Sequence, residues 1–165
     1  MAQKKKVTPF LWFDDQAEEA VNFYASIFKD SHIGKITRYG KNAPRPEGMV
    51  MTISFELGGQ EFTALNGGPQ YKFNEAVSFQ ISCDSQDEVD HYWEKLSEGG
   101  EEGPCGWLTD KYGMAWQVTP VALTELLSDS DPAKVERVME AAMQMKKIEI
   151  EPLQQAYDGV EQGAE

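Results

Sequence analysis

Two segments of this chain repeat the same order of residue types, and this internal repeat limits the possible folds more than any other feature of the sequence. Each segment begins with a short apolar run, continues through an aspartate and further acidic residues, and reaches a pair of aromatic residues. Asp15 and Asp84 are 69 positions apart, and so are Phe23 and Tyr92, which open the aromatic pairs. A constant offset predicts two copies of one structural unit, neither of which buries its sheet face alone.

Each copy is predicted to contain one amphipathic helix after its first strand. Asp15 and Asp84 stand where an N-cap belongs, because a short polar side chain can accept a hydrogen bond from a free amide of the first turn. The acidic residues that follow suit the positive end of the helix dipole. Apolar residues then recur at helical spacing in both segments.

Strand patterns follow each predicted helix. In the first copy, Met49–Leu57 and Gln60–Asn66 are separated by Gly58-Gly59, which predicts a tight β-hairpin. In the second copy, a shorter hairpin is expected between Gly106–Leu108 and Ala115–Thr119.

These elements predict an α+β fold made of two βαβββ modules. The modules span residues 7–69 and 76–120, and together they are expected to form a curved mixed sheet with the helices on its outside. Residues 121–157 form a C-terminal helical extension. We expect one domain over residues 7–157, a size at which a single core is sufficient for folding.

The extension has its own sequence pattern. Asp131 and Pro132 predict a helix start, with a capping residue and a first-turn proline, and apolar residues recur after them at three- and four-residue spacing. Ile148 and Ile150 alternate as in a short strand, and Pro152–Tyr157 suggests a last helical turn. The methionines here suit either a packing helix over the core or dimer contact, or a partner groove or lid.

Composition narrows the possible partners. The 165 residues include 15 basic and 28 acidic side chains, a net charge of −13, which repels nucleic acid and anionic membrane surfaces. The N-terminus is not expected to be a signal peptide, and no window approaches the roughly 20 apolar residues of a membrane span. Two cysteines without a CxxC motif predict a soluble, reduced, cytoplasmic protein.

Several motifs resemble the PhnB-like branch of the vicinal oxygen chelate superfamily, which includes glyoxalase I, extradiol dioxygenases and bleomycin-resistance proteins. The similar runs are Ala64–Pro69, Phe73–Phe79, Cys105–Leu108, Asp110–Gly113 and Trp116–Val118. The resemblance covers residues 7–157 and implies paired βαβββ modules, as the repeat predicts independently. Members of this branch are often described as demethylubiquinone methyltransferase-like. The chain has no Gly-rich strand-to-helix turn of the kind that a nucleotide-like methyl donor needs.

Strand parity predicts which side chains line the cavity that relatives use. On Ser78–Cys83, the side chains of Ser78 and Gln80 point to one face, and on Met114–Thr119 the side chain of Gln117 opposes that of Trp116. The polar set is expected on the concave face. Trp116 and its neighbours of the same parity are expected to pack under the helices.

The resemblance matches four positions to the family's metal ligands, namely Pro9, Asn66, Ser78 and Gln117. Divalent metals in the superfamily are held by imidazole and carboxylate groups, whereas these four residues offer at most neutral oxygens. We therefore expect neither a metal nor another cofactor. The predicted ligand-binding residues are Asn66, Ser78, Gln80, Trp107 and Gln117.

Other reactive residues have simpler structural interpretations. His32 is expected at the end of the first helix and His91 within the second, each as a surface or partly packed side chain. Cys105 is either an inert thiol or an accessible nucleophile, although no histidine lies near it in sequence to lower its pKa. Asp110 fits the chemistry of a turn.

Two functions remain open. The first is metal-independent binding of a small molecule, and the second is an enzyme of the glyoxalase/dioxygenase type, or one with demethylubiquinone methyltransferase-like activity, in the same cavity. Because relatives pair modules to complete this cavity, a homodimer is also expected.

Overall fold

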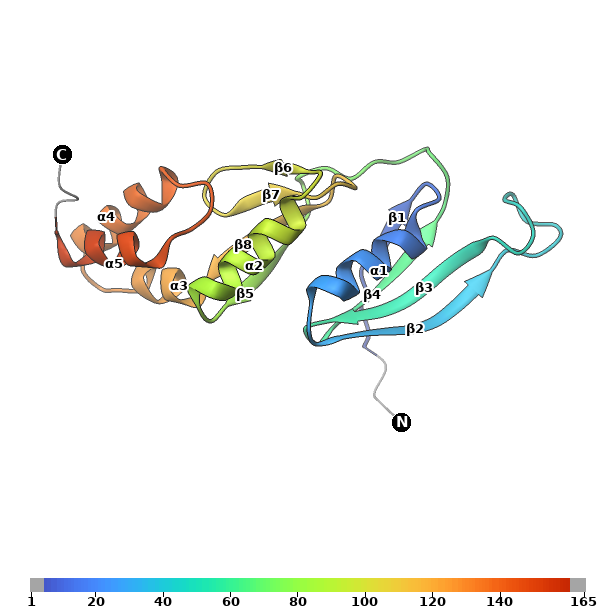
Figure 1. Cartoon of the computed structure of the whole chain (residues 1–165), viewed down its shortest axis with the longest axis horizontal. Helices are drawn as coiled ribbons and strands as arrows, with labels where there is room; N and C mark the ends of the chain where they lie inside the picture. The colour runs from blue at the N-terminus through green and yellow to red at the C-terminus, as the bar shows by residue number, and fades with distance from the viewer. Residues whose placement is uncertain (1–4, 161–165) are drawn as a thin grey trace. The chain divides into compact units, whose positions relative to one another are not determined.

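The computed structural model describes residues 5–160, and the chain separates into two compact units, Met1–Phe73 and Asn74–Glu165. The first unit contains, in chain order, β1 (Phe10–Phe13), α1 (Ala17–Ile27), β2 (Ser31–Arg38), β3 (Val50–Leu57) and β4 (Gln60–Asn66) (Figure 1). The predicted hairpin is confirmed, since Leu57 lies opposite Gln60 and both turn glycines have positive φ.

The second unit repeats this order and adds helices. It contains β5 (Ser78–Cys83), α2 (Gln86–Ser97), β6 (Glu101–Glu102), β7 (Trp107–Thr109), β8 (Ala115–Pro120), α3 (Val121–Leu127), α4 (Pro132–Met143) and α5 (Ile150–Asp158). The α+β class and the two βαβββ modules are therefore confirmed. No helix within residues 5–160 is long and apolar enough to cross a membrane.

Each unit holds one four-stranded mixed sheet, and the two sheets have the same strand order. The orders are β1-β4-β3-β2 and β5-β8-β7-β6. In both, the first strand pairs in parallel with the last, so that Phe13 lies opposite Asn66 and Cys83 lies opposite Pro120. The other pairs are antiparallel.

The helix of each module covers one face of its sheet (Figure 1). Burial alternates along the strands as this arrangement requires: Leu11 and Phe13 of β1 are buried, and so are Ile81 and Cys83 of β5. Tyr24 of α1 is fully buried against this core. The residues of opposite parity form the sheet face that no helix of the module covers.

Both helices begin one residue later than Asp15 and Asp84 predict. The N-cap of α2 is Ser85, whose side chain accepts the Glu88 amide, while Glu88 accepts the Asp84 amide in return. This reciprocal arrangement satisfies free amides at the helix start. Gln16 occupies the N-cap of α1 but makes no capping bond with its side chain.

The C-terminal extension forms three helices with a small core of their own. Asp131 caps α4 as predicted, since its side chain accepts the Ala133 amide. The strand predicted at Ile148 and Ile150 is wrong. Ile148 is instead buried in a cluster with residues of α3, α4 and α5, and Ile150 begins α5. Burial among the helices therefore explains the isoleucine at position 148, whereas Ile150 is half-buried at the start of α5.

Asn66 caps α1 in place of Gln16, whose side chain makes no capping hydrogen bond. It is 2% exposed, and its Oδ1 accepts the Ala17 amide at 2.8 Å while its Nδ2 donates to the Val50 carbonyl at 3.1 Å. Its main-chain oxygen accepts the Tyr39 hydroxyl at 2.6 Å. The side chain therefore joins the end of β4 to the start of α1 and to β3.

Replacing Asn66 with alanine is expected to lower the free energy of unfolding by roughly 2–4 kcal/mol, because the Ala17 amide and Val50 carbonyl both lose a buried partner. Urea denaturation of the full chain measures the change. Asn74→Ala is the matched control, since Asn74 is exposed and accepts the neighbouring Ala76 amide. Equal stability losses for the two variants would show that Asn66 has no structural role.

Candidate functional site

Four of the five predicted ligand-binding residues lie on one face of the second sheet. Trp107 is directly opposite Gln117 on β7 and β8, and Gln117 is directly opposite Gln80 on β5. Ser78 has the same parity as Gln80, and its Oγ is 2.9 Å from the Nε2 of Gln117, which donates to it. The register thus produces a row of polar groups beside an indole, on the face opposite α2.

The prediction that Asn66 shares such an open face is wrong. Its parity on β4 is that of Phe62 and Ala64, which are buried with the helix. Matching the two sequence runs placed Asn66 over Gln117, but strand pairing gives another correspondence. Phe10 lies opposite Thr63 as Gln80 lies opposite Gln117.

Thr63 is therefore the residue of the first unit that corresponds to Gln117, and Thr8 corresponds to Ser78. The same pairing shows that Pro9 was matched to Ser78 one residue out of register. Pro9 precedes β1 and has the opposite parity to Thr8. Hydroxyl groups thus stand in the first unit where the second has Gln117 and Ser78. Sequence similarity alone did not reveal that Thr63, not Asn66, corresponds to Gln117. The end of β4 binds the start of α1 through Asn66, whereas the end of β8 leads into α3.

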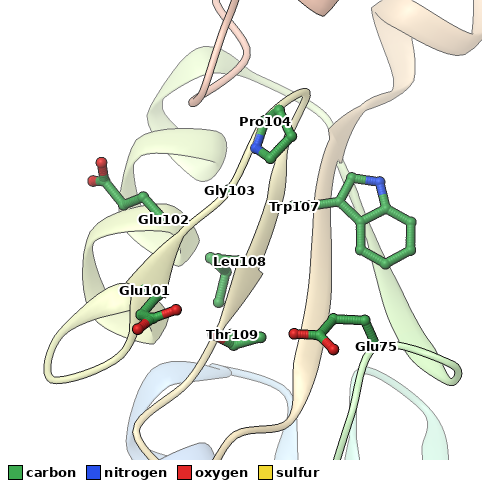
Figure 2. Close-up of a pocket in the computed structure, with 8 residues that line it drawn as sticks. All are labelled: Glu75, Glu101, Glu102, Gly103, Pro104, Trp107, Leu108 and Thr109. Atoms are coloured by element: carbon green, nitrogen blue, oxygen red, sulfur yellow. The ribbon is translucent and has the colours of Figure 1, made fainter.

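A cavity of about 420 Å³ adjoins Trp107 in the second unit. Its lining residues are Glu75, Glu101, Glu102, Gly103, Pro104, Trp107, Leu108 and Thr109. In Figure 2 the Glu75 carboxylate lies below the Trp107 indole and is turned toward Thr109. Glu102 is partly engaged, since its Oε1 accepts the Trp93 indole N–H at 3.0 Å. The cavity therefore combines an aromatic wall with a rim of carboxylates.

Asp110 holds the hairpin that carries this site. Its carboxylate is 3% exposed and accepts the Tyr112 and Met114 amides at 2.9 and 3.1 Å. The other oxygen accepts the Trp116 indole N–H at 2.9 Å. Turn chemistry was predicted for Asp110, but its burial and its bond to Trp116 were not. Trp116 itself is buried, as parity predicts.

The first unit has a row of ionisable groups that the sequence interpretation missed. His32 lies on β2 rather than at the end of α1, directly opposite Glu56, and Glu56 is directly opposite Glu61. With Thr8 and Thr63 they line a cavity of about 260 Å³. The Gly58-Gly59 hairpin could have indicated the Glu56–Glu61 pair, because a two-residue turn fixes which residues face each other.

The two cysteines are poor nucleophiles. Burial, with the nearby Glu88 and Asp84 carboxylates, raises the pKa of Cys83 to about 12. Burial also raises the pKa of Cys105. Since the thiolate is the reactive form, these shifts favour the inert interpretation of Cys105 over the nucleophilic one.

The residues at the positions that the resemblance matches to the superfamily's metal ligands carry no charged group that would hold a divalent cation. With the corrected correspondence these positions hold Thr8, Thr63, Ser78 and Gln117, all neutral oxygen or amide groups, and the Gln117 amide donates to Ser78. Zinc and related metals are held by imidazole, thiolate and carboxylate ligands. Among residues 5–160, no group of three or more His, Cys, Asp or Glu side chains is arranged to hold a metal ion.

Two βαβββ units in one chain define the fold of the vicinal oxygen chelate superfamily, and solved structures support this class. The PhnB protein from Bacillus cereus is 38% identical, with a TM-score of 0.63, over 70% of this chain and 99% of that one. PA1353 from Pseudomonas aeruginosa is 21% identical, with a TM-score of 0.58, over 71% of this chain and 98% of that one. The fosfomycin resistance protein FosX from Mesorhizobium loti is 15% identical, with a TM-score of 0.53, over 77% and 99%. The last two show the fold alone.

The family is defined more narrowly by a model described as 3-demethylubiquinone-9 3-methyltransferase, which matches residues 5–119. The chain belongs to this family, the PhnB-like branch of the superfamily. No curated protein matches the sequence. The family match ends within β8, so α3, α4 and α5 lie beyond it.

Face assignment in the second sheet can be tested by two neighbouring substitutions. Trp116→Ala is expected to lower the free energy of unfolding by about 3–5 kcal/mol, as truncation of a core aromatic does. Gln117→Leu is expected to change it by less than about 1 kcal/mol, because that side chain is on the open face. Thermal and urea unfolding measure both. Unfolding of the Gln117 variant beside a stable Trp116 variant would reverse the assignment.

Proposed function

We propose that the protein binds a small, flat organic molecule on the Trp107 face of its second unit, without a metal ion. The observation that carries this proposal is a cavity of about 420 Å³ that has Trp107 in its lining. Gln117 and Ser78 lie on the same sheet face as Trp107, but they are not among the residues that line the cavity. A volume of this size suits a small-molecule pocket. The indole offers a stacking surface, and the lining residues Glu75 and Thr109 offer hydrogen-bonding groups.

The carboxylates at the rim of the cavity determine which ligand charge is favourable there. Glu75, Glu101 and Glu102 are exposed at the cavity, and the whole chain has a net charge of −13. Their potential attracts cations and repels anions. A cation above the indole is also stabilised by the ring's negative face. We therefore propose a neutral or cationic aromatic ligand rather than an anionic one.

Binding can be tested with three probes of similar size, benzylamine, benzyl alcohol and benzoate, titrated against the full chain by saturation-transfer NMR. Benzylamine and benzyl alcohol are expected to bind more tightly than benzoate. Trp107→Leu is expected to weaken their binding at least about tenfold, or about 1.4 kcal/mol. Phe10→Leu is the matched control, since Phe10 is an exposed aromatic residue of the first unit.

Two results would contradict the binding proposal. One is tightest binding of benzoate, and the other is equal loss of binding in the Trp107 and Phe10 variants. Native mass spectrometry of the purified protein searches in parallel for a bound compound of biological origin. Turnover of such a compound to a product would replace the binding role by an enzymatic one in the same cavity.

Metal independence is tested separately. Because Thr8, Thr63, Ser78 and Gln117 supply no charged ligand, we expect purified protein to contain well under one zinc, nickel, iron or manganese per chain. A chelator is expected to leave the melting temperature unchanged, since removing a bound metal would destabilise the native state. Elemental analysis and thermal melts with and without EDTA measure both. About one metal per chain, removed by EDTA with a lower melting temperature, would refute this part.

The expected homodimer stays a prediction. Ile33 and Ile36 on the edge strand β2, and Met139 and Met143 on α4, are exposed apolar side chains that a second copy could cover. The proposed binding site does not depend on this assembly.

A further inference from the structure

The loop that carries Trp107 is hydrogen-bonded to the C-terminal extension. The Cys105 amide donates to the Met145 carbonyl at 2.7 Å, and the Gly106 amide donates to the Lys146 carbonyl at 2.8 Å. Both acceptors lie in the segment between α4 and α5. Two main-chain bonds thus connect the residues immediately before Trp107 with a part of the chain that the family model does not include.

The loop has a backbone conformation that needs such outside support. Cys105 has a φ of 53° and Gly106 a φ of 81°, so two consecutive residues are left-handed. This region is unfavourable for a residue with a Cβ, and it persists where surrounding contacts determine it. A Cβ at Gly106 would lie 2.8 Å from the Val118 oxygen and 3.2 Å from Cγ1 of Ile148. The loop is therefore tightly enclosed between β8 and the extension.

Main-chain hydrogen bonds within the loop fix the position of Trp107. The Trp107 amide donates to the Pro104 carbonyl at 3.0 Å, and the Gly103 amide donates to the Trp107 carbonyl at 2.8 Å. Gly103, Pro104 and Trp107 all line the cavity shown in Figure 2. A shift of the loop would therefore move the aromatic wall of the cavity.

Gln86 on α2 holds the other side of the same segment. Its Oε1 accepts the Ile150 amide at 2.8 Å, and its Nε2 donates to the Ile148 carbonyl at 3.1 Å. Lys147 forms an ion pair with Asp90 on the same helix at 2.9 Å. The side chain of Ile148 is 1% exposed in the core of the extension. Residues 145–150 are thus fixed by α2 on one side and bond the Trp107 loop on the other.

We propose that the C-terminal extension is a clamp that sets the position of Trp107 in the binding cavity, with Gln86 as a positioning residue. This inference rests on the proposed function, because it gives the extension a role at that site. The clamp acts through the backbone of residues 103–107, and Gln86 itself does not contact the ligand.

The test uses the full chain labelled with 5-fluorotryptophan and compares Gln86→Leu with wild type. Gln86→Leu removes both side-chain bonds to the segment and keeps an aliphatic side chain there. The ¹⁹F signal of Trp107, assigned through Trp107→Phe, is expected to shift or broaden, while the signal of Trp12 in the first unit stays in place. Hydrogen exchange at the Cys105 and Gly106 amides is expected to become at least about tenfold faster than in wild type, with exchange at buried Ile81 unchanged.

Thiol modification gives a second readout. Cys105 packs against the core of the extension, and burial there raises its pKa. Loosening the clamp should lower that pKa toward the ordinary value and speed its reaction with Ellman's reagent several-fold. Cys83 is the internal control, because it is 1% exposed and should remain unreactive until the protein unfolds.

Gln154→Leu is the matched control variant, since Gln154 is an exposed glutamine of α5 whose side chain donates to Asp158. It should leave all these signals at wild-type values. If Gln86→Leu unfolds the protein, Leu153→Ala replaces it, because this truncation loosens the core of the extension from within.

The proposal is overturned if exchange at the Ile150 amide rises in these variants while Trp107, Cys105 and Gly106 keep their wild-type signals. That result would make the extension a stabilising element only. These readouts need no ligand, so a failed probe titration would count against the proposed function without deciding the clamp. Where benzyl alcohol does bind, Gln86→Leu should weaken its binding and Gln154→Leu should not.

Discussion

Parallel pairing between the first and last strands of each unit is the constraint on which the rest of the structure depends. In the second unit, Gln80 lies opposite Gln117 and Ile81 lies opposite Val118. The second pair is buried beneath the helix, so the first pair must face away from it. Because side chains alternate along a strand, a slip of one residue would exchange the core face with the open face. One register therefore determines both the hydrophobic core and the candidate site.

The residue at the end of the last strand has a different role in each unit. In the first, Asn66 lies on the helix side at the end of β4 and caps α1, because Gln16 gives no side-chain cap. In the second, Ser85 caps α2, so the corresponding position needs no amide and holds Pro120, from which the chain enters α3. Gln117 lies on the opposite face of β8 and corresponds to Thr63 of the first unit rather than to Asn66. The end of the last strand therefore caps a helix in the first unit, whereas in the second unit it leads into the C-terminal extension.

Local chemistry made part of this structure predictable from the sequence. The Gly58-Gly59 turn fixed a hairpin register, Asp131 and Pro132 marked a helix start, and alternation separated Trp116 from Gln117. Each of these signals acts between residues close in sequence. They were sufficient for the fold class and for four of the five predicted site residues to share a face.

The remaining features depend on contacts between distant residues. Asn66 accepts a hydrogen bond from the amide of Ala17, 49 positions away in the sequence. A polar residue at the end of a strand, which was expected to bind a ligand, therefore caps a helix. His32 was misplaced because the helix ends at Ile27 and the chain has already entered β2 at Ser31. Ile148 and Ile150 resembled a strand, but Ile148 is buried in a helical cluster and Ile150 is the first residue of α5. The spacing of apolar residues in a sequence indicates which side chains are buried, but it does not indicate which helix or strand buries them.

The description of the family model names a methyltransferase, whereas the role that we propose for this chain is the binding of a small molecule. Methyl transfer needs a donor site beside the acceptor, commonly at a glycine-rich turn that opens a helix. In both units the corresponding turns contain aspartates, and the first helical turns add Glu18 and Glu19 in α1 and Asp87 and Glu88 in α2. These carboxylates would repel an anionic group at the two helix starts, where Asn66 and Ser85 already accept backbone amides. A cavity of about 420 Å³ beside Trp107 is in the size range of small-molecule pockets, and this is the basis of the binding role that we propose.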